Sequence, residues 1–259
     1  MIRRIYPTRF GQLHLRSNEG KGVPLILLHG SPRSGAMWEP LQEKIERPTH
    51  APDRLGYGFS DAPPWALTIE QYAQATVDGL LAAGMQGQVD VLGIHAGSLE
   101  AIEIAIQLGA QVRRVGVIGM PLFTTEEQLR QMEKYTEQPL KPATEGGHLL
   151  GAWRGCFGNR EPPYDLPDAQ RRFLELVLAA HPGAAFRAAC AYAVDEKLGE
   201  LTVPLVVFAP HDEIIEQTRR AEAMLGAYTT YLDLPELGAD VLHGSLDQIV
   251  ALLDRHLPP

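Results

Sequence analysis

A single histidine stands where the chain passes from a predicted strand into a predicted helix. His95 lies between Gly93 and Gly97, and the residue that follows it, Ala96, is also small. Small flanking residues allow a strand and a helix to approach closely, and histidine tolerates the positive φ of a sharp turn better than a β-branched residue does. An imidazole held there can act as a general base, a general acid, a nucleophile or a metal ligand. The pattern predicts a reactive side chain at position 95.

Three segments in order place this histidine in a wider framework. The segment His29–Arg33 (HGSPR) directly follows the first clear core strand, Asp53–Ser60 (DRLGYGFS) follows the next strand, and Gly93–Gly97 (GIHAG) joins a strand to a helix. These segments resemble the His-Gly oxyanion loop, the Asp-x-x-Gly-x-Gly-x-Ser turn and the nucleophile elbow of the α/β-hydrolase family. The resemblance covers most of the chain. It implies a doubly wound, mostly parallel α/β sheet of about eight strands with a helical cap.

The residue at the nucleophile position departs from that family. The family normally has serine there, less often cysteine or aspartate, whereas this chain has His95. An imidazole cannot form an ordinary seryl ester, so an acyl-enzyme carried by a serine is not expected at this position. Ser98, three residues later, is an alternative nucleophile, although the family usually has a small packing residue there.

The resemblance also assigns groups around His95. The segment Ala209–Glu213 follows an apolar run and resembles the acid-bearing strand end of the family, so Asp212 is the carboxylate expected to orient a base. The backbone N–H groups of Ser31 and Ala96 are the expected oxyanion-hole donors, and neither depends on a serine at the elbow.

The family's catalytic histidine is the second departure. After the last strand the family has Gly-His, whereas here Gly238 is followed by Ala239 and Asp240, and His243 comes three or four residues late. Two alternatives stay open. Either the loop is arranged so that His243 points into the site, or Asp240 occupies the third place of the triad.

Three further residues are candidates for substrate binding. Arg33 follows the predicted oxyanion loop and has the charge to hold a substrate carboxylate, with a solvated or structural arginine as the alternative. His148 and Trp153 fall in the predicted cap, where they are candidates to line the substrate pocket, with simple packing as the alternative.

The elements that position these residues follow from the hydrophobic pattern. Short apolar runs alternate with amphipathic helical patterns, which is typical of a parallel sheet wrapped by helices. The predicted strands are residues 24–28, 90–93, 115–118, 205–208 and 229–234, and the predicted core helices are residues 68–83, 97–108 and 246–257. The segment 121–202 contains helical patterns but no clear strand. It is therefore predicted to be a helical cap inserted between core parts 1–120 and 203–259.

Composition indicates a protein with one large domain and disfavours some kinds of partner. The chain has 259 residues, enough for one large α/β domain, and its net charge of −9 disfavours nucleic acid and anionic membranes as partners. The two cysteines, Cys156 and Cys190, form neither a disulfide framework nor a zinc pattern. No signal peptide or membrane-spanning run is evident, so a cytoplasmic location is predicted.

The leading hypothesis is an enzyme in which His95 is an acid or base beside the two oxyanion N–H groups. It would act on a small carbonyl or acyl compound by hydrolysis, or by cleavage of a C–C or C–X bond, with no cofactor and no metal. One alternative is a non-catalytic protein that kept the pocket and binds a small molecule. Another is a metal site formed by His95, Asp212 and His243. A homodimer is compatible with either class.

Overall fold

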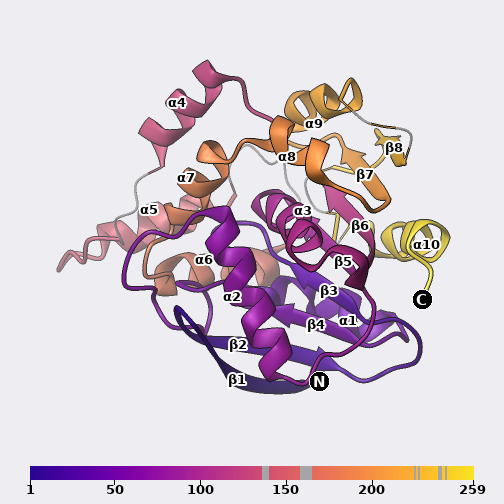
Figure 1. The fold of residues 1–259 in the computed structure, drawn as a ribbon. Coiled ribbons are helices and arrows are strands. Elements are labelled where there is room, and N and C mark those ends of the chain that lie inside the picture. The colour runs from indigo at the N-terminus through magenta and orange to yellow at the C-terminus, as the bar shows by residue number, and fades with distance from the viewer. Residues whose placement is uncertain (136–139, 158–164, 225, 227, 239–240, 243) are drawn as a thin grey trace.

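The computed structural model describes residues 1–135, 140–157, 165–224, 226, 228–238, 241–242 and 244–259. Its centre is one eight-stranded sheet in the order β1-β2-β4-β3-β5-β6-β7-β8 (Figure 1). The strands are β1 (Ile2–Thr8), β2 (Gly11–Asn18), β3 (Leu25–Leu28), β4 (Thr49–Pro52), β5 (Val89–Ile94), β6 (Val112–Ile118), β7 (Leu205–Pro210) and β8 (Thr229–Leu234). Strands β3 to β8 are parallel to one another, and β2 is antiparallel to both β1 and β4. The predicted mostly parallel sheet is confirmed.

Helices cover both faces of this sheet. They are α1 (Glu39–Lys44), α2 (Ile69–Ala82), α3 (Ala96–Leu108), α4 (Thr125–Lys134), α5 (Gly147–Gly155), α6 (Leu166–Leu178), α7 (Ala184–Ala191), α8 (Val194–Glu200), α9 (Ile215–Glu222) and α10 (Leu246–His256). One apolar cluster joins α2 and α3 to one face of the sheet, and a second joins α1 and α10 to the other face. Because both faces are covered, β3, β5 and β7 are buried along their whole length and have no alternating polar residues.

Local sequence explains where the core helices begin. Thr68 caps α2, since its hydroxyl accepts the N–H of Gln71 while the Gln71 side chain accepts the N–H of Thr68. This cap at Thr68 agrees with the prediction. The N-terminal hairpin of β1 and β2 was not predicted, because most β1 side chains are exposed and the strand therefore lacks an apolar pattern.

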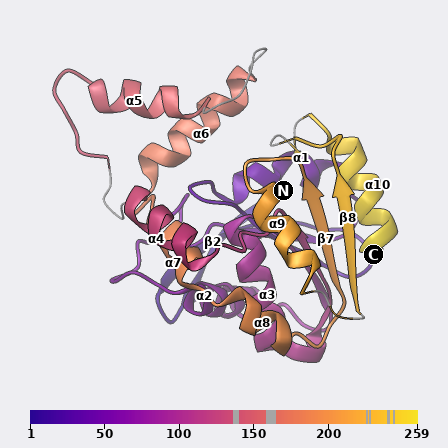
Figure 2. The same cartoon turned by 90° about the horizontal axis from the view of Figure 1, so that it is seen from above.

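The segment between β6 and β7 consists of helices joined by irregular loops in the part that the structure describes, and this helical character agrees with the prediction. It contains α4 to α8, and no strand is found among its described residues. Its last two helices pack against α3, and Ala185, Ala189 and Tyr192 belong to the same apolar cluster as the inner face of α3. Helices α5 and α6 pack on each other and project away from the sheet (Figure 2). We call residues 121–202 the helical insertion.

None of the described helices combines the length and the apolar character that a bilayer crossing requires.

Candidate active site

The turn between β5 and α3 holds His95 in a strained conformation. Its φ is 52°, and among the described residues it is the only non-glycine residue with positive φ. A Cβ on Gly93 would lie 2.0 Å from the carbonyl oxygen of Gly97, and a Cβ on Gly97 would lie 2.3 Å from the carbonyl oxygen of Leu28. Both glycines are therefore required by close backbone approach, as the sequence pattern predicts. The turn presents the side chain of His95 at the carboxyl end of β5.

The carboxyl ends of three neighbouring strands meet at this point. The N–H of His95 donates to the carbonyl of Ile118 in β6, and the N–H of Gly119, directly after β6, donates to the carbonyl of Phe208 in β7, each at 3.0 Å. Asp212 follows the end of β7 by two residues. The parallel register of β5, β6 and β7 therefore brings positions 95, 119 and 212 together. Open α/β sheets place their ligands at this edge.

His95 and Asp212 form a direct pair. The Nε2 atom of His95 lies 2.8 Å from Oδ2 of Asp212, and the two side chains are 27% and 2% exposed respectively. The other carboxylate oxygen of Asp212 accepts the N–H of Ile214 at 2.9 Å, which fixes the orientation of the carboxylate. Asp212 thus contacts an imidazole, and this imidazole belongs to the elbow residue itself.

Gly119 leaves space for the His95–Asp212 pair. This role was not predicted from the sequence. Its φ is 63°, and a Cβ at this position would lie 2.9 Å from Cδ2 of His95 and 3.1 Å from Oδ2 of Asp212. The available signal was the glycine placed directly after a core strand. Its meaning depends on β6 lying between β5 and β7, which the sequence pattern alone did not establish.

Several groups act on the pKa of His95. Burial is the largest effect and lowers the pKa, but the hydrogen bond and the charge of Asp212, together with the charge of Glu213, outweigh it. Arg172 opposes them weakly, and the net result is a pKa above the usual value of histidine. Since the carboxylate accepts a hydrogen bond from Nε2, the neutral ring carries its lone pair on Nδ1. Nδ1 is then the nitrogen able to take up a proton.

The proposed oxyanion donors lie on two sides of His95. Ala96 is the first residue of α3, so its N–H has no partner within the helix and lies at the positive end of the helix dipole. Ser31 lies in the loop after β3 and lines a cavity next to His95. Its hydroxyl accepts a hydrogen bond of 2.9 Å from Arg54, whose guanidinium also donates to the carbonyl of His29 at 3.0 Å.

His29 itself is structural. It is buried, its Nε2 accepts the N–H of Arg54 at 2.9 Å, and its Nδ1 lies 2.7 Å from the carbonyl oxygen of Gly30. Burial, reinforced by the charge of Arg54, lowers the pKa of His29 to about 3. The ring is therefore neutral near pH 7, and it shapes the loop that carries Ser31.

The cavity beside His95 has a volume of about 210 Å³. The core contributes Ser31, Arg33 and His95 to its wall, and the helical insertion contributes Cys156, Arg172 and Leu176. The insertion thus closes one side of the site. A cavity of this size next to a perturbed histidine is a candidate site for a small molecule.

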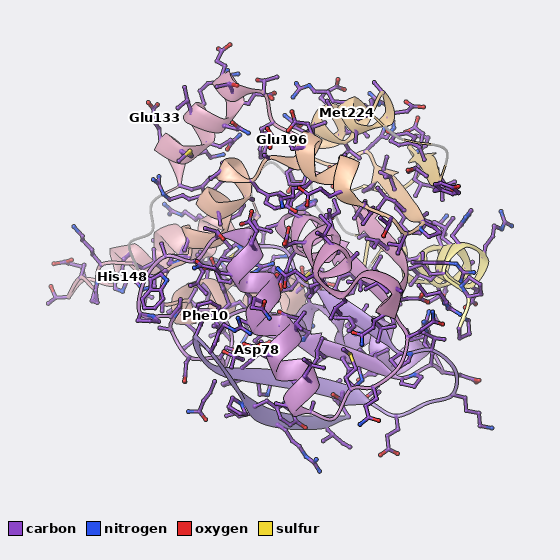
Figure 3. The ribbon with its side chains drawn as sticks, viewed as in Figure 1. Phe10, Asp78, Glu133, His148, Glu196 and Met224 are labelled. Atoms are coloured by element: carbon purple, nitrogen blue, oxygen red, sulfur yellow. The ribbon has the colours of Figure 1, made fainter. Side chains whose placement is uncertain are left out.

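The remaining candidates have different surroundings. Arg33 lines the cavity, but its guanidinium pairs with Asp168 and Glu175, which favours the structural alternative. His148 and Trp153 are not among the described residues that line the cavity. His148 accepts the N–H of Ala143 at 3.1 Å and lies near one edge of the molecule (Figure 3).

Trp153 packs edge-to-face against Phe157 and Phe173, which agrees with the packing alternative. Ser98 is fully buried, and its hydroxyl donates to the carbonyls of Gly93 and Gly119 at 3.1 and 2.9 Å. It is a packing residue, so the displaced-nucleophile alternative is wrong.

Asp240 and His243 lie outside the described residues. The alternative metal site, which needs His243, is therefore untested.

Known proteins are similar to this chain in sequence and in fold. Residues 25–252 match the model of the alpha/beta hydrolase family. The chain is 30% identical over 128 residues to the pimeloyl-(acyl-carrier protein) methyl ester esterase of Aliivibrio salmonicida, a match covering 46% of this chain and 47% of the esterase. It is 31% identical over 107 residues to the 2-hydroxymuconate semialdehyde hydrolase of a Pseudomonas strain, covering 39% and 38% of the two chains.

The likeness of fold extends over the whole chain. The enol-lactonase of Burkholderia xenovorans LB400 superimposes with a TM-score of 0.79 at 16% identity, covering 99% of this chain and all of the other. A thermophilic esterase of Thermogutta terrifontis superimposes with a TM-score of 0.76 at 18% identity, covering 99% and 98%. The family match, the eight-stranded sheet and the ordered motifs agree, and the chain belongs to the alpha/beta hydrolase family.

Proposed function

We propose that this protein is a hydrolase that activates water with the His95–Asp212 pair and acts on a small ester, lactone or related carbonyl compound. The observation that carries the proposal is the 2.8 Å contact between Nε2 of His95 and the buried carboxylate of Asp212, at the edge of the cavity. Relatives named as an esterase, a semialdehyde hydrolase and an enol-lactonase support a carbonyl substrate.

The reaction begins with neutral His95. Its Nδ1 takes a proton from water, whose oxygen attacks the carbonyl carbon of the substrate, while Asp212 stabilises the imidazolium that forms. The N–H groups of Ser31 and Ala96 donate to the oxyanion of the tetrahedral intermediate. The imidazolium then returns its proton to the leaving oxygen as the carbon–oxygen bond breaks. The products are an acid and an alcohol, and no covalent enzyme intermediate is needed.

The helical insertion serves as a cap in this scheme. Arg172 and Leu176 of α6 and Cys156 at the end of α5 cover the cavity and limit the size of the reacting group. His243 and Asp240 keep the roles proposed from the sequence, a second base or a third member of the catalytic group.

Substitution of His95 tests the proposal. We expect His95→Ala to lower kcat on the best substrate from a panel of small esters and lactones by about 10²–10⁴-fold, the usual contribution of a general base. The fold should be retained, because Gly93 and Gly97 form the turn and alanine keeps the same Cβ that His95 already holds at this positive φ. Circular dichroism checks the fold, and His148→Ala is the matched control.

Two outcomes would contradict the proposal. Equal turnover by wild type and His95→Ala would exclude His95 from the chemistry. Tight binding of a panel compound by a wild-type protein that never turns it over would identify a non-catalytic binding protein. Product analysis separates hydrolysis of an ester or lactone from C–C or C–X cleavage, because only the ester or lactone gives a carboxylic acid together with a new hydroxyl group from the broken carbon–oxygen bond.

A further inference from the structure

Helix α6 presents one charged face to the loop that carries Ser31. Asp168, Arg172 and Glu175 are spaced at i, i+4 and i+7, so they lie on the same side of the helix. The side chains of Asp168 and Glu175 are only 2% and 8% exposed. Buried carboxylates are costly unless they are paired, so their partners identify what this face is built to hold.

Arg172 pairs with Asp168 within α6, and the other partners are Arg33 and Ser34 of the loop that carries Ser31. One oxygen of Glu175 accepts the Ser34 hydroxyl at 2.6 Å and the Ser34 N–H at 3.2 Å, and the other pairs with Nε of Arg33. Asp168 accepts a second hydrogen bond from Arg33 at 3.1 Å. Glu175 therefore receives three donors from two consecutive residues.

The same loop is held from the opposite side by Arg54. Its guanidinium contacts the Ser31 hydroxyl and the His29 carbonyl, and it is itself paired with Glu100 at 2.9 Å. Arg54 belongs to the core, whereas Glu175 belongs to the helical insertion. The loop is thus clamped between the core and the insertion, and Glu175 is not among the described residues that line the cavity.

We propose that Glu175 is a positioning residue for the oxyanion hole. By holding Arg33 and Ser34 it fixes the backbone that leads to Ser31, and it makes the seating of α6 a condition for a well-placed Ser31 N–H. This inference rests on the proposed function. A donor that is only loosened should cost less than the 10²–10³-fold lost when an oxyanion donor is removed.

Glu175→Gln is the test, with Glu133→Gln as the matched control on an exposed site of the same insertion (Figure 3). We expect kcat to fall by about tenfold in Glu175→Gln, part of the loss seen on deleting an oxyanion donor, with KM changed by less than about twofold. Amide hydrogen exchange should accelerate in a peptide covering residues 30–38. Glu133→Gln should match wild type in both measurements.

Ser34→Ala guards against a variant that fails to fold. It keeps the Arg33 pair and the Ser34 N–H, and it removes the hydroxyl that donates to Glu175 and accepts the N–H of Ala36. It should therefore give a smaller loss of kcat and a smaller rise in exchange. Unchanged kcat and unchanged exchange in Glu175→Gln would overturn the inference, as would a loss of kcat that simply follows global unfolding. If wild type has no hydrolase activity, the proposed function fails, while the exchange measurement still decides whether Glu175 holds the loop.

Discussion

His95 occupies a strained turn and also carries the imidazole that pairs with Asp212. A non-glycine residue at positive φ costs about 1–3 kcal/mol, and such strain is maintained where the surrounding structure enforces it. Here the close approach of Gly93 and Gly97 enforces the turn, and the hydrogen bond to Asp212 fixes the ring. The outcome is an imidazole whose protonation is controlled by a buried carboxylate.

The pH dependence of catalysis follows from this pair. A general base works in its neutral form, so kcat/KM of wild type should rise with pH, with a midpoint above the 6.5 usual for histidine. Asp212→Asn removes the hydrogen-bonding charge that raises the pKa of His95 and leaves its burial in place. The midpoint should therefore move to lower pH. The plateau should fall by at least about tenfold, because the base is weaker.

A pH–rate series on wild type, Asp212→Asn and Glu213→Gln checks this expectation. Glu213→Gln removes a weaker effect of the same sign, so its midpoint should lie between the other two. An Asp212→Asn midpoint equal to or above that of wild type would show that Asp212 does not control the titrating group.

Gly119 provides a second test at the residue scale. Gly119→Ala places a methyl group within about 3 Å of both His95 and Asp212, so it should separate the pair and lower kcat by about tenfold or more. Gly109→Ala is the matched control. Its φ of 52° imposes a similar backbone strain, but nothing lies within 4 Å of its Cβ position.

The comparison separates steric contact from backbone strain. Both variants should lose stability in thermal unfolding, Gly119→Ala more because its methyl group also meets His95 and Asp212. Only Gly119→Ala should lose activity and the elevated midpoint of the pH profile. Equal loss of activity in the two variants would mean that the contact with the His95–Asp212 pair does not matter.

At the scale of elements, the site depends on a buried carboxylate that connects two helices to the segment after β4. Glu100 on α3 is buried and accepts Nε of Arg54 at 2.9 Å and the Thr76 hydroxyl of α2 at 2.7 Å. One carboxylate therefore joins α2, α3 and the segment after β4, and its partner Arg54 supports Ser31. Glu100 therefore contributes both to the packing of these helices and, through Arg54, to the geometry of the loop that carries Ser31.

Removal of the negative charge of Glu100 should destabilise the fold. Glu100→Gln leaves the buried guanidinium of Arg54 without its counter-ion, and breaking a buried pair in this way costs about 3–5 kcal/mol. Urea unfolding of the variant measures the change in free energy, with Glu196→Gln on the exposed surface of α8 as the control. A change below about 1 kcal/mol, typical of exposed pairs, would show that the Arg54–Glu100 pair contributes little.

For the whole molecule, the titration of His95 links stability to activity. The pKa of His95 is raised in the folded chain, so its protonated form stabilises the fold. That contribution is fully present below the unfolded-state pKa of about 6.5 and is lost as the pH rises through the raised folded-state pKa. The neutral base needed for catalysis forms over the same range. Stability and activity should therefore change in opposite directions.

Thermal unfolding across pH 5 to 9 (a range of about four units around the usual histidine pKa) measures this linkage. The difference in Tm between wild type and His95→Gln should favour wild type most at the acidic end and decline as the pH rises. Subtracting the variant removes the titration of other groups such as His29. A difference that is constant with pH would contradict the raised pKa of His95.

The fold class and the tight turn at His95 could be predicted from residue patterns. Alternating strand and helix patterns predicted the parallel sheet, and the glycines around His95 predicted the tight turn, because both depend on short-range sterics and periodicity. The segment after β7 predicted Asp212 as an orienting carboxylate. Strand β1 escaped prediction because most of its side chains are exposed and an edge strand needs no apolar pattern.

Contacts between distant residues could not be predicted in this way, because they depend on how the strands are arranged in the sheet. His95 and Asp212 are 117 positions apart, and their contact, like the space left by Gly119, depends on β5, β6 and β7 being neighbours in one sheet. The same holds for Arg33, whose charge pairs with carboxylates of α6 more than a hundred residues away. Sequence patterns describe what each segment can do alone. The pairing of buried charges is determined by which segments exclude water together, and that is a property of the packed molecule.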